Sequence, residues 1–176
     1  MNSPAPAPRT AVPFNFDAAG SWCFGWYHAP AAPSRDQVVV MCRPVGWEAT
    51  CSYPTYVQLA HALSNAGFAV LRFDYPGTGD SGGDGDEPHR VDDWIAATHA
   101  AITQARRLSG ATSVALFGVR LGATLAWQAA TQQMKGVDAM VLWAPCASGK
   151  AFVRELRAAG TETFSGGIDA LGGRYT

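Results

Sequence analysis

The five residues Gly118-Val119-Arg120-Leu121-Gly122 come closest to a reactive motif in this sequence. They follow a short apolar run, 113–117, and precede a segment rich in Ala and Thr. This is the context of a nucleophile elbow, G-x-S-x-G, in which flanking glycines let a strand turn sharply into a helix and lift the central side chain out of the sheet. The central residue here is Arg120, whose guanidinium is always protonated and has only hydrogen-bond donors. The motif therefore predicts the turn but supplies no nucleophile.

Around this motif, the hydrophobic pattern predicts alternating strands and helices. Aromatic residues at 14–16 and 22–26 flank a turn-like segment and predict an antiparallel hairpin. Later apolar runs without alternation predict strands covered on both faces, as in a parallel sheet, at 38–42, 69–73, 113–117 and 139–143. Helix signals predict helices from Pro54, after Ser52, to just before Gly67, then at 91–105 and at about 121–134. The sequence thus predicts an α/β fold with a doubly wound, mostly parallel sheet and an N-terminal β-hairpin.

Three segments in this order resemble the α/β-hydrolase superfamily. They are Pro44-Val45-Gly46-Trp47-Glu48 after the first parallel strand, Phe73-Asp74-Tyr75-Pro76-Gly77-Thr78-Gly79-Asp80-Ser81 after the second, and Gly118 to Gly122. The similarity runs from about Phe14 to Arg157 and is closest to the serine-aminopeptidase-like branch, which includes exosortase-associated hydrolases. It implies an incomplete α/β-hydrolase fold. A flexible Pro/Ala-rich tail is expected at 1–12, the N-terminal part of the hydrolase core at 13–149 and the start of a truncated cap at 150–176.

The resemblance also implies where the reaction machinery of the family would lie. An oxyanion hole is expected at the backbone N–H of Leu121, together with an N–H of the loop that contains Val45 and Gly46. The catalytic Asp and His of the family follow the cap, and the sequence stops at Thr176 before those positions. The histidines present all precede Arg120, which is the wrong order for this fold's triad: His28, His61, His89 and His99. No catalytic triad can be written from these residues.

Arg120 has two alternative roles. Beside the N–H groups of a helix N-terminus, a fixed cation can hold a carboxylate or phosphate group of a ligand. Alternatively, it forms an internal ion pair with Glu48, which the resemblance places near the same cleft, or with Asp74 or Asp80. We favour the internal pair over the ligand seat.

A second glycine-rich segment, Gly77 to Gly82, matches the dinucleotide fingerprint G-x-G-x-x-G. That motif must open directly into a helix, but residues 83–88 intervene here, and the next strand ends in Gly118 rather than in an acidic ribose ligand. We therefore interpret the segment as a tight turn in which Asp74 and Ser81 bond to the backbone, and no cofactor is expected.

The cysteines give no sign of a metal site, because they form no CxxC pair and have no histidine at ligand spacing. Cys51 and Cys146 lie where ligand sites of open α/β sheets collect, but neither has a base identifiable from sequence, and we interpret both as packing residues. The segment from Lys150 to Arg157 has apolar residues at helical spacing and is expected to begin the cap.

The composition is that of a globular domain, with 48% hydrophobic and 15% charged residues in a chain of 176. A net charge of −1 without a basic block argues against nucleic acid as a partner. No apolar run approaches the ~20 residues of a membrane span, and the first 12 residues lack the pattern of a signal peptide, so we expect a cytoplasmic protein. Without the later strands of the family, the sheet would keep an unprotected edge, which predicts self-association.

Two functions from different classes follow. In the first, the chain is an α/β-hydrolase-like protein whose family hydrolyses an ester, thioester or amide, with the activity impaired because Arg120 replaces the serine and no downstream Asp or His is present. In the second, the fold is a non-catalytic binding module that holds a small acyl or anionic ligand, or a partner, at the Arg120 cleft. Fold-level analogy alone does not decide between them.

Overall fold

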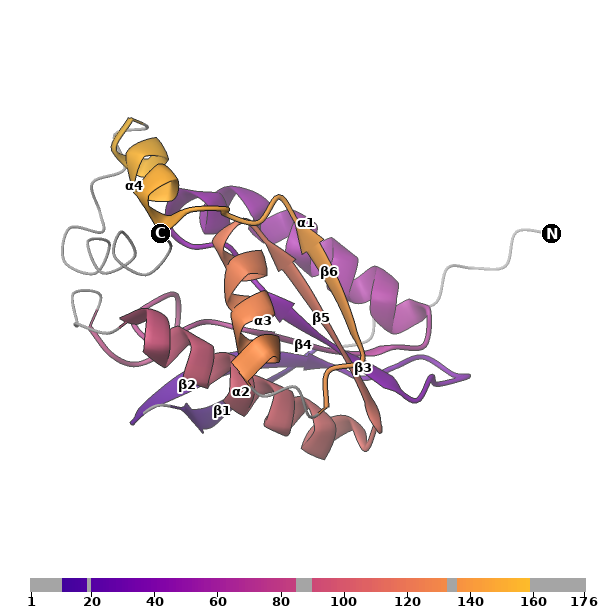
Figure 1. Cartoon of the computed structure of the whole chain (residues 1–176). Coiled ribbons are helices and arrows are strands. Elements are labelled where there is room, and N and C mark those ends of the chain that lie inside the picture. The colour runs from indigo at the N-terminus through magenta and orange to yellow at the C-terminus, as the bar shows by residue number, and fades with distance from the viewer. Residues whose placement is uncertain (1–10, 19, 85–89, 133–135, 159–176) are drawn as a thin grey trace.

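The computed structural model describes residues 11–18, 20–84, 90–132 and 136–158 (Figure 1). The first ten residues of the expected tail and most of the expected cap segment lie outside these ranges. Within them, the chain forms a six-stranded sheet with the order β1-β2-β4-β3-β5-β6. The strands are β1 Val12–Ala18, β2 Ser21–His28, β3 Gln37–Cys42, β4 Ala69–Phe73, β5 Ser113–Val119 and β6 Ala139–Trp143.

The sheet is mostly parallel, with an antiparallel hairpin at one side. Strands β4, β3, β5 and β6 run parallel to one another, whereas β2 is antiparallel to β4 and β1 is antiparallel to β2. The hairpin turns between Ala18 and Ser21, as the aromatic pattern predicted. All of β4, and β3 from its second residue onward, are buried, in agreement with their continuous apolar runs.

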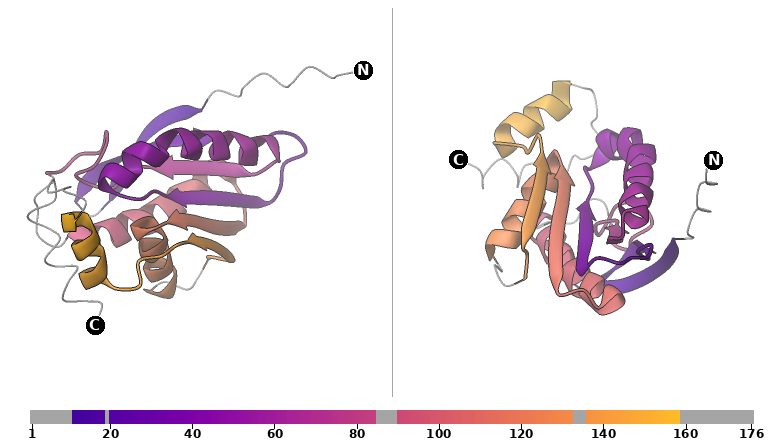
Figure 2. Two further views of the ribbon diagram at one scale, coloured as in Figure 1. Left: turned by 90° about the horizontal axis from the view of Figure 1, so that it is seen from above. Right: turned by 90° about the vertical axis from the view of Figure 1, so that its right-hand side faces the viewer.

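Helices cover both faces of the sheet (Figure 2). Helix α1, Gly46–Asn65, packs on β4 and β2, whereas α2, Arg90–Ser109, and α3, Leu121–Gln132, pack against each other on the opposite face. The fourth helix, α4, Gly149–Ala158, follows β6. The predicted doubly wound α/β fold is therefore confirmed. Among the residues that the structure describes, none of the helices combines the length and the apolar composition needed to cross a bilayer.

The start of α1 was predicted wrongly. The helix begins at Gly46, so that Pro54 lies in its interior and not in its first turn. Proline removes a helical hydrogen bond and normally favours a helix start. Here the packing of Ala49 and Tyr56 against the sheet, where both side chains are buried, keeps the segment on either side of Pro54 helical. Strand β1 likewise begins at Val12, one residue inside the segment predicted as tail.

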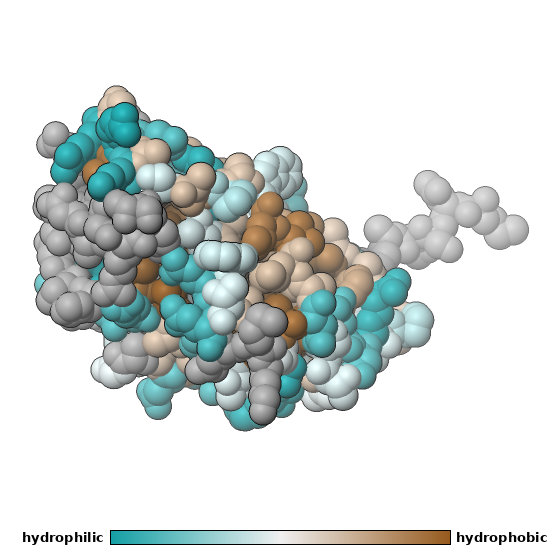
Figure 3. All heavy atoms as spheres, in the orientation of Figure 1, coloured by the Kyte–Doolittle hydropathy of each residue, from teal (hydrophilic) through white to brown (hydrophobic). Residues whose placement is uncertain are grey.

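Strand β6 differs from the other parallel strands in being largely exposed. Its residues Met140, Val141 and Trp143 are 41%, 58% and 67% exposed, and Figure 3 shows apolar surface over this strand. In the described part of the chain, β6 pairs only with β5 and forms an edge of the sheet. The self-association expected from an open edge stays a prediction.

Glycine is required on both sides of Arg120 because the backbone packs there without room for a side chain. A β-carbon at Gly118 would lie 2.6 Å from the Cα of Ala123. A β-carbon at Gly122 would overlap the carbonyl oxygens of Cys42 and Arg43 at the end of β3. The two glycines therefore let the first turn of α3 rest directly on the ends of β5 and β3.

We predict that Gly122→Ala destabilises the chain, although alanine favours a helix by about 1 kcal/mol. The added methyl group forces the first turn of α3 away from β3, which costs about 1–3 kcal/mol beyond the helix gain. The free energy of unfolding from urea titration measures the effect. Thr131→Ala, at an exposed position of the same helix, is the control, because it raises helix propensity without entering a close backbone contact. Equal stability of Gly122→Ala and the parent chain would contradict the close packing.

Candidate functional site

Arg120 occupies a tight strand-to-helix turn between β5 and α3. Its φ angle is 55°, in the left-handed region that few side chains adopt. Its backbone N–H donates to the carbonyl of Trp143 at 2.9 Å, and its carbonyl accepts from the N–H groups of Ala123 and Thr124. The turn is thus fixed to the end of β6 and to the start of α3, and it projects the Arg120 side chain from the carboxyl ends of the strands.

The guanidinium of Arg120 joins three elements. Its Nε donates to Oε1 of Glu48 on α1 at 2.9 Å, and a terminal nitrogen pairs with Glu155 on α4. The guanidinium carbon also lies 6.0 Å from the ring centre of Phe152. Partial burial acts to lower the Arg120 pKa, but the hydrogen bonds to the two carboxylates outweigh burial and raise it. The cation is therefore permanent, and the three charged groups together carry a formal charge of −1.

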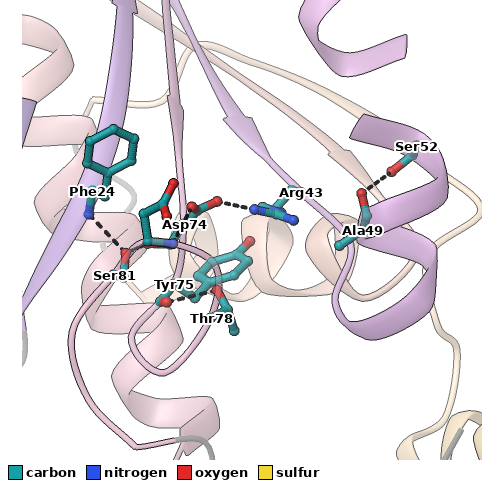
Figure 4. Close-up of polar contacts among 9 residues, drawn as sticks. Phe24, Arg43, Ala49, Ser52, Asp74, Tyr75, Thr78 and Ser81 are labelled. Atoms are coloured by element: carbon teal, nitrogen blue, oxygen red, sulfur yellow. Dashed lines mark hydrogen bonds and ion pairs between the residues drawn. The ribbon is translucent and has the colours of Figure 1, made fainter. Parts of the chain in front are cut away.

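Of the acidic residues considered for Arg120, the structure brings Glu48 to it but places Asp74 elsewhere. Asp74 pairs with Arg43 and accepts from the backbone N–H of Asp80 at 3.1 Å (Figure 4). Ser81 donates to the Asp74 carbonyl at 2.7 Å and accepts from the Phe24 N–H at 2.9 Å. This glycine-rich segment is held by side-chain to backbone bonds, as expected for a structural turn.

The loop at Val45 and Gly46 lies close to the start of α3, since Gly122 rests on the end of β3 immediately before that loop. Val45 caps α1 in an extended conformation, and no side chain bonds to the first N–H groups of this helix. Beside the loop is a cavity of about 310 Å³ between the start of α1 and the glycine-rich turn, lined by Arg43, Pro44, Val45, Gly46, Ala49, Thr50, Gly77, Thr78 and Gly79. The backbone N–H groups at the start of α1 and at the start of α3 therefore lie at the same edge of the sheet, where β3 and β5 end.

Comparison with known proteins identifies the family. Residues 35–165 match the family described as serine aminopeptidase, S33. The chain belongs to this family of α/β hydrolases. The human protein ABHD12B is 38% identical over 132 residues, which are 73% of this chain and 34% of the human protein. The chain therefore spans about a third of the length of that relative.

Solved structures agree on the α/β-hydrolase fold. XC6422 from Xanthomonas campestris, a serine hydrolase without a lid, superimposes with a TM-score of 0.66 at 19% identity, over 80% of this chain and 64% of the other. Est1E from Butyrivibrio proteoclasticus, solved with ferulic acid, gives a TM-score of 0.67 at 20% identity, over 81% and 56%. At these identities the likeness shows the fold alone, and in both cases the chain spans less than two thirds of the other protein.

The described residues around the turn of this family member offer no evident replacement for the missing serine. The backbone N–H of Cys146 donates to the hydroxyl oxygen of Thr124 at 2.9 Å, which places Cys146 near Arg120. Burial raises the pKa of its thiol to about 11, despite the opposing effect of Arg120, so the thiol is protonated at neutral pH and is a poor nucleophile. His99 donates to the Ala129 carbonyl at 2.8 Å, and His89 lies outside the described residues.

The other two histidines belong to a different part of the molecule, beside a buried arginine that the sequence analysis did not single out. Arg72 on β4 is 9% exposed, and its Nε donates to Nε2 of His28 at 3.1 Å. The ring of His28 lies 5.0 Å from that of His61. Burial, together with the charge of Arg72 and the proximity of His61, lowers the pKa of His28 to about 4. Arg72 therefore has a neutral imidazole as its hydrogen-bond partner at neutral pH.

Glu155 and Arg43 are contacts of the candidate site that the sequence analysis also missed. Glu155 lies 35 positions after Arg120, in a segment whose polar residues resemble a solvated helix face. Arg43 directly follows β3, but nothing in its neighbours marks it as the partner of Asp74. No local signal identifies either contact, because each depends on how α4 or the glycine-rich turn packs in three dimensions.

We predict that Arg120→Ala loosens α4, because the substitution removes the ion pair to Glu155. The pair is partly exposed, with 58% of the Glu155 side chain accessible, so its contribution is at most about 1 kcal/mol and exchange should accelerate about two- to fivefold. Backbone hydrogen exchange of α4 measures the change. Arg154→Ala, an exposed position on the same helix, is the control and should leave exchange unaltered. Unchanged protection in Arg120→Ala would show that the ion pair does not hold α4.

We also predict a pH dependence of stability that arises from His28. Since the folded pKa lies near 4 and the ordinary value is 6.5, unfolded chains take up a proton first as the pH falls. Stability is then lost between pH 6.5 and 4 by roughly 3 kcal/mol in total, and above pH 6.5 the residue has no further effect. The measurement is the unfolding free energy of the parent chain and of His28→Gln across this pH range. The difference between the two curves gives the contribution of His28, because the carboxylates that titrate in the same range are common to both proteins. Parallel curves for the two proteins would contradict the prediction.

Proposed function

We propose that this chain is an α/β-hydrolase-fold protein that binds a small acyl compound without hydrolysing it through the elbow position. The observation that carries the proposal is the state of Arg120. It stands where G-x-S-x-G has the serine, in a turn with the left-handed backbone conformation of an elbow, and its guanidinium is held by Glu48 and Glu155. A donor-only cation in that place can neither attack a carbonyl carbon nor accept a proton.

The charges around Arg120 favour a neutral ligand over an anion. The guanidinium already has two carboxylate partners, and the cluster has a net charge of −1. An anionic ligand on the remaining guanidinium donors would face the negative charges of both Glu48 and Glu155. The anion seat considered from the sequence is therefore the weaker version of the binding hypothesis.

The backbone beside Arg120 supports binding of a carbonyl group. The N–H of Leu121 at the start of α3, and the N–H groups of Val45 and Gly46 at the start of α1, are the donors that this family's oxyanion hole would use. Such donors depend on the backbone path and not on the residue at position 120. In addition, Oε2 of Glu48 is buried and has no hydrogen-bond partner within the described chain. A hydroxyl or amide N–H of the ligand would satisfy it.

Family membership favours a second candidate, hydrolysis of an ester, thioester or amide. The chain spans about a third of the human relative, so the activity of a longer protein is a proposal of its own. It requires an Asp and a His beyond the present residues, and it requires a nucleophile other than Arg120. The two candidates differ in one measurable property, turnover.

Turnover is tested with a panel of short-chain p-nitrophenyl esters and the purified chain, alongside Arg120→Ala and Arg120→Ser. We expect release of nitrophenol at the buffer rate for all three proteins, because none of the histidines in the described ranges contacts position 120. Protein-dependent release that falls sharply in Arg120→Ala would overturn the proposal and reveal catalysis that uses the cation.

Binding is tested separately with 4-nitroacetophenone, an uncleavable ketone analogue of the acetate ester, by saturation-transfer NMR. We expect a signal from the parent chain and its loss in Thr50→Trp, because Thr50 lines the cavity beside Val45 and Gly46 and a tryptophan there fills it. Thr55→Trp, an exposed position on the same helix that does not line this cavity, is the matched control. Equal signals from both variants would contradict binding at this place.

A further inference from the structure

A second cavity, with about 40 Å³ of enclosed space, lies between α1 and the strands β2, β3 and β4, on the opposite face of the sheet from α2 and α3. Its lining includes five aromatic residues and two arginines: Phe24, Trp26, Met41, Arg43, Ala49, Ser52, Tyr53, Tyr56, Arg72, Phe73, Asp74 and Asp80. Figure 4 shows part of it, with Arg43 between Asp74 and the first turns of α1. Neither Arg120 nor its carboxylate partners line it. It shares Arg43 and Ala49 with the cavity beside Val45 and Gly46, but Arg72 lines this cavity and not the other.

Arg72 is the unusual group in this cavity. Its side chain is about nine-tenths buried, and within the described chain its interactions are the bond from Nε to His28 and a contact of its guanidinium with the ring of Tyr53, at 5.7 Å. Its two terminal nitrogens have no hydrogen-bond partner there and are not among the fully buried unpaired atoms. They therefore reach the cavity surface as unused donors.

No carboxylate of the described chain balances the charge of Arg72. Asp74, which lines the same cavity, is paired with Arg43. His28 accepts one hydrogen bond as a neutral ring and so contributes no negative charge. A buried cation without a counter-charge is unfavourable, because burial removes its hydration without a compensating pair. A carboxylate can accept two parallel hydrogen bonds from the planar guanidinium of an arginine, so it is the anion that suits this group best.

The remaining lining restricts what can accompany the carboxylate. Aromatic side chains from β2 and α1 favour a flat apolar body, and Tyr53, which is 45% exposed, lies at the rim. Asp80 is an exposed acid at the mouth and disfavours a ligand with more than one negative charge.

We propose that this cavity binds a small aryl carboxylate, with the carboxylate on the terminal nitrogens of Arg72 and the ring at the rim, between Tyr53 and the aromatic side chains of β2. The site is built by the side chains of four elements, and it does not depend on whether the Arg120 cleft binds or cleaves an acyl compound.

The test is calorimetric titration of the whole 176-residue chain with sodium benzoate. We expect saturable binding at millimolar concentration or below, at least tenfold weaker in Arg72→Gln, because the charged hydrogen bonds are lost. Arg35→Gln is the matched control: Arg35 also stacks on a ring, that of Phe68 at 4.9 Å, but is exposed and does not line the cavity. Benzamide, which has the ring without the charge, should bind more weakly than benzoate.

Two further variants keep the test decisive if Arg72→Gln fails to fold. Arg72→Lys keeps the positive charge but loses the two parallel N–H donors of the guanidinium, whereas Tyr53→Ala removes a residue of the cavity rim and leaves the core intact. Each variant should weaken benzoate binding while its far-ultraviolet circular dichroism stays that of the parent chain. Absence of binding up to about 10 mM benzoate, or equal affinity in the parent chain and in folded Arg72 variants, would overturn the proposal.

Discussion

The close contact between the first turn of α3 and the ends of β5 and β3 is the constraint on which the candidate site depends. Gly118 and Gly122 permit it, because neither position has room for a β-carbon. The contact forces the intervening residue into a left-handed conformation, and its side chain then points away from the sheet. The position of that side chain is therefore set by backbone packing and not by the chemistry of the residue. This is why the same turn can present an arginine in place of a serine without a change of fold.

An arginine at this place alters the electrostatics of the cleft as well as its reactivity. A serine would leave Glu48 without a cationic partner, whereas Arg120 neutralises it and also reaches Glu155 on α4. The side chain that would face a substrate instead connects α1, the turn and the helix that follows β6. The Arg120 side chain thus connects α1 and α4 through its two ion pairs, which accords with the proposed binding role.

The sequence predicted the fold well because its signals are local and agree with one another. Continuous apolar runs marked the buried strands, and the glycines marked the turn at Arg120. It failed at the start of α1, where Pro54 suggested a first turn but the burial of Ala49 and Tyr56 decided the conformation. Of the acidic candidates, Glu48 could be connected to Arg120 through the resemblance. The partners of Asp74 and Arg72 could not, because they come from strands and loops that meet only after folding.

Arg120 and Arg72 lead to opposite conclusions about anionic ligands. Arg120 is prominent in the sequence, yet its charge is more than balanced by carboxylates of the chain, so an anion gains little by binding to it. Arg72 has no motif around it, yet it is the more deeply buried cation and its only hydrogen-bond partner in the described chain is a neutral ring. Because the free energy that an anion gains depends on the charge left uncompensated, the motif is the poorer guide here. An anion is therefore better accommodated at Arg72, in the cavity between α1 and the strands β2, β3 and β4.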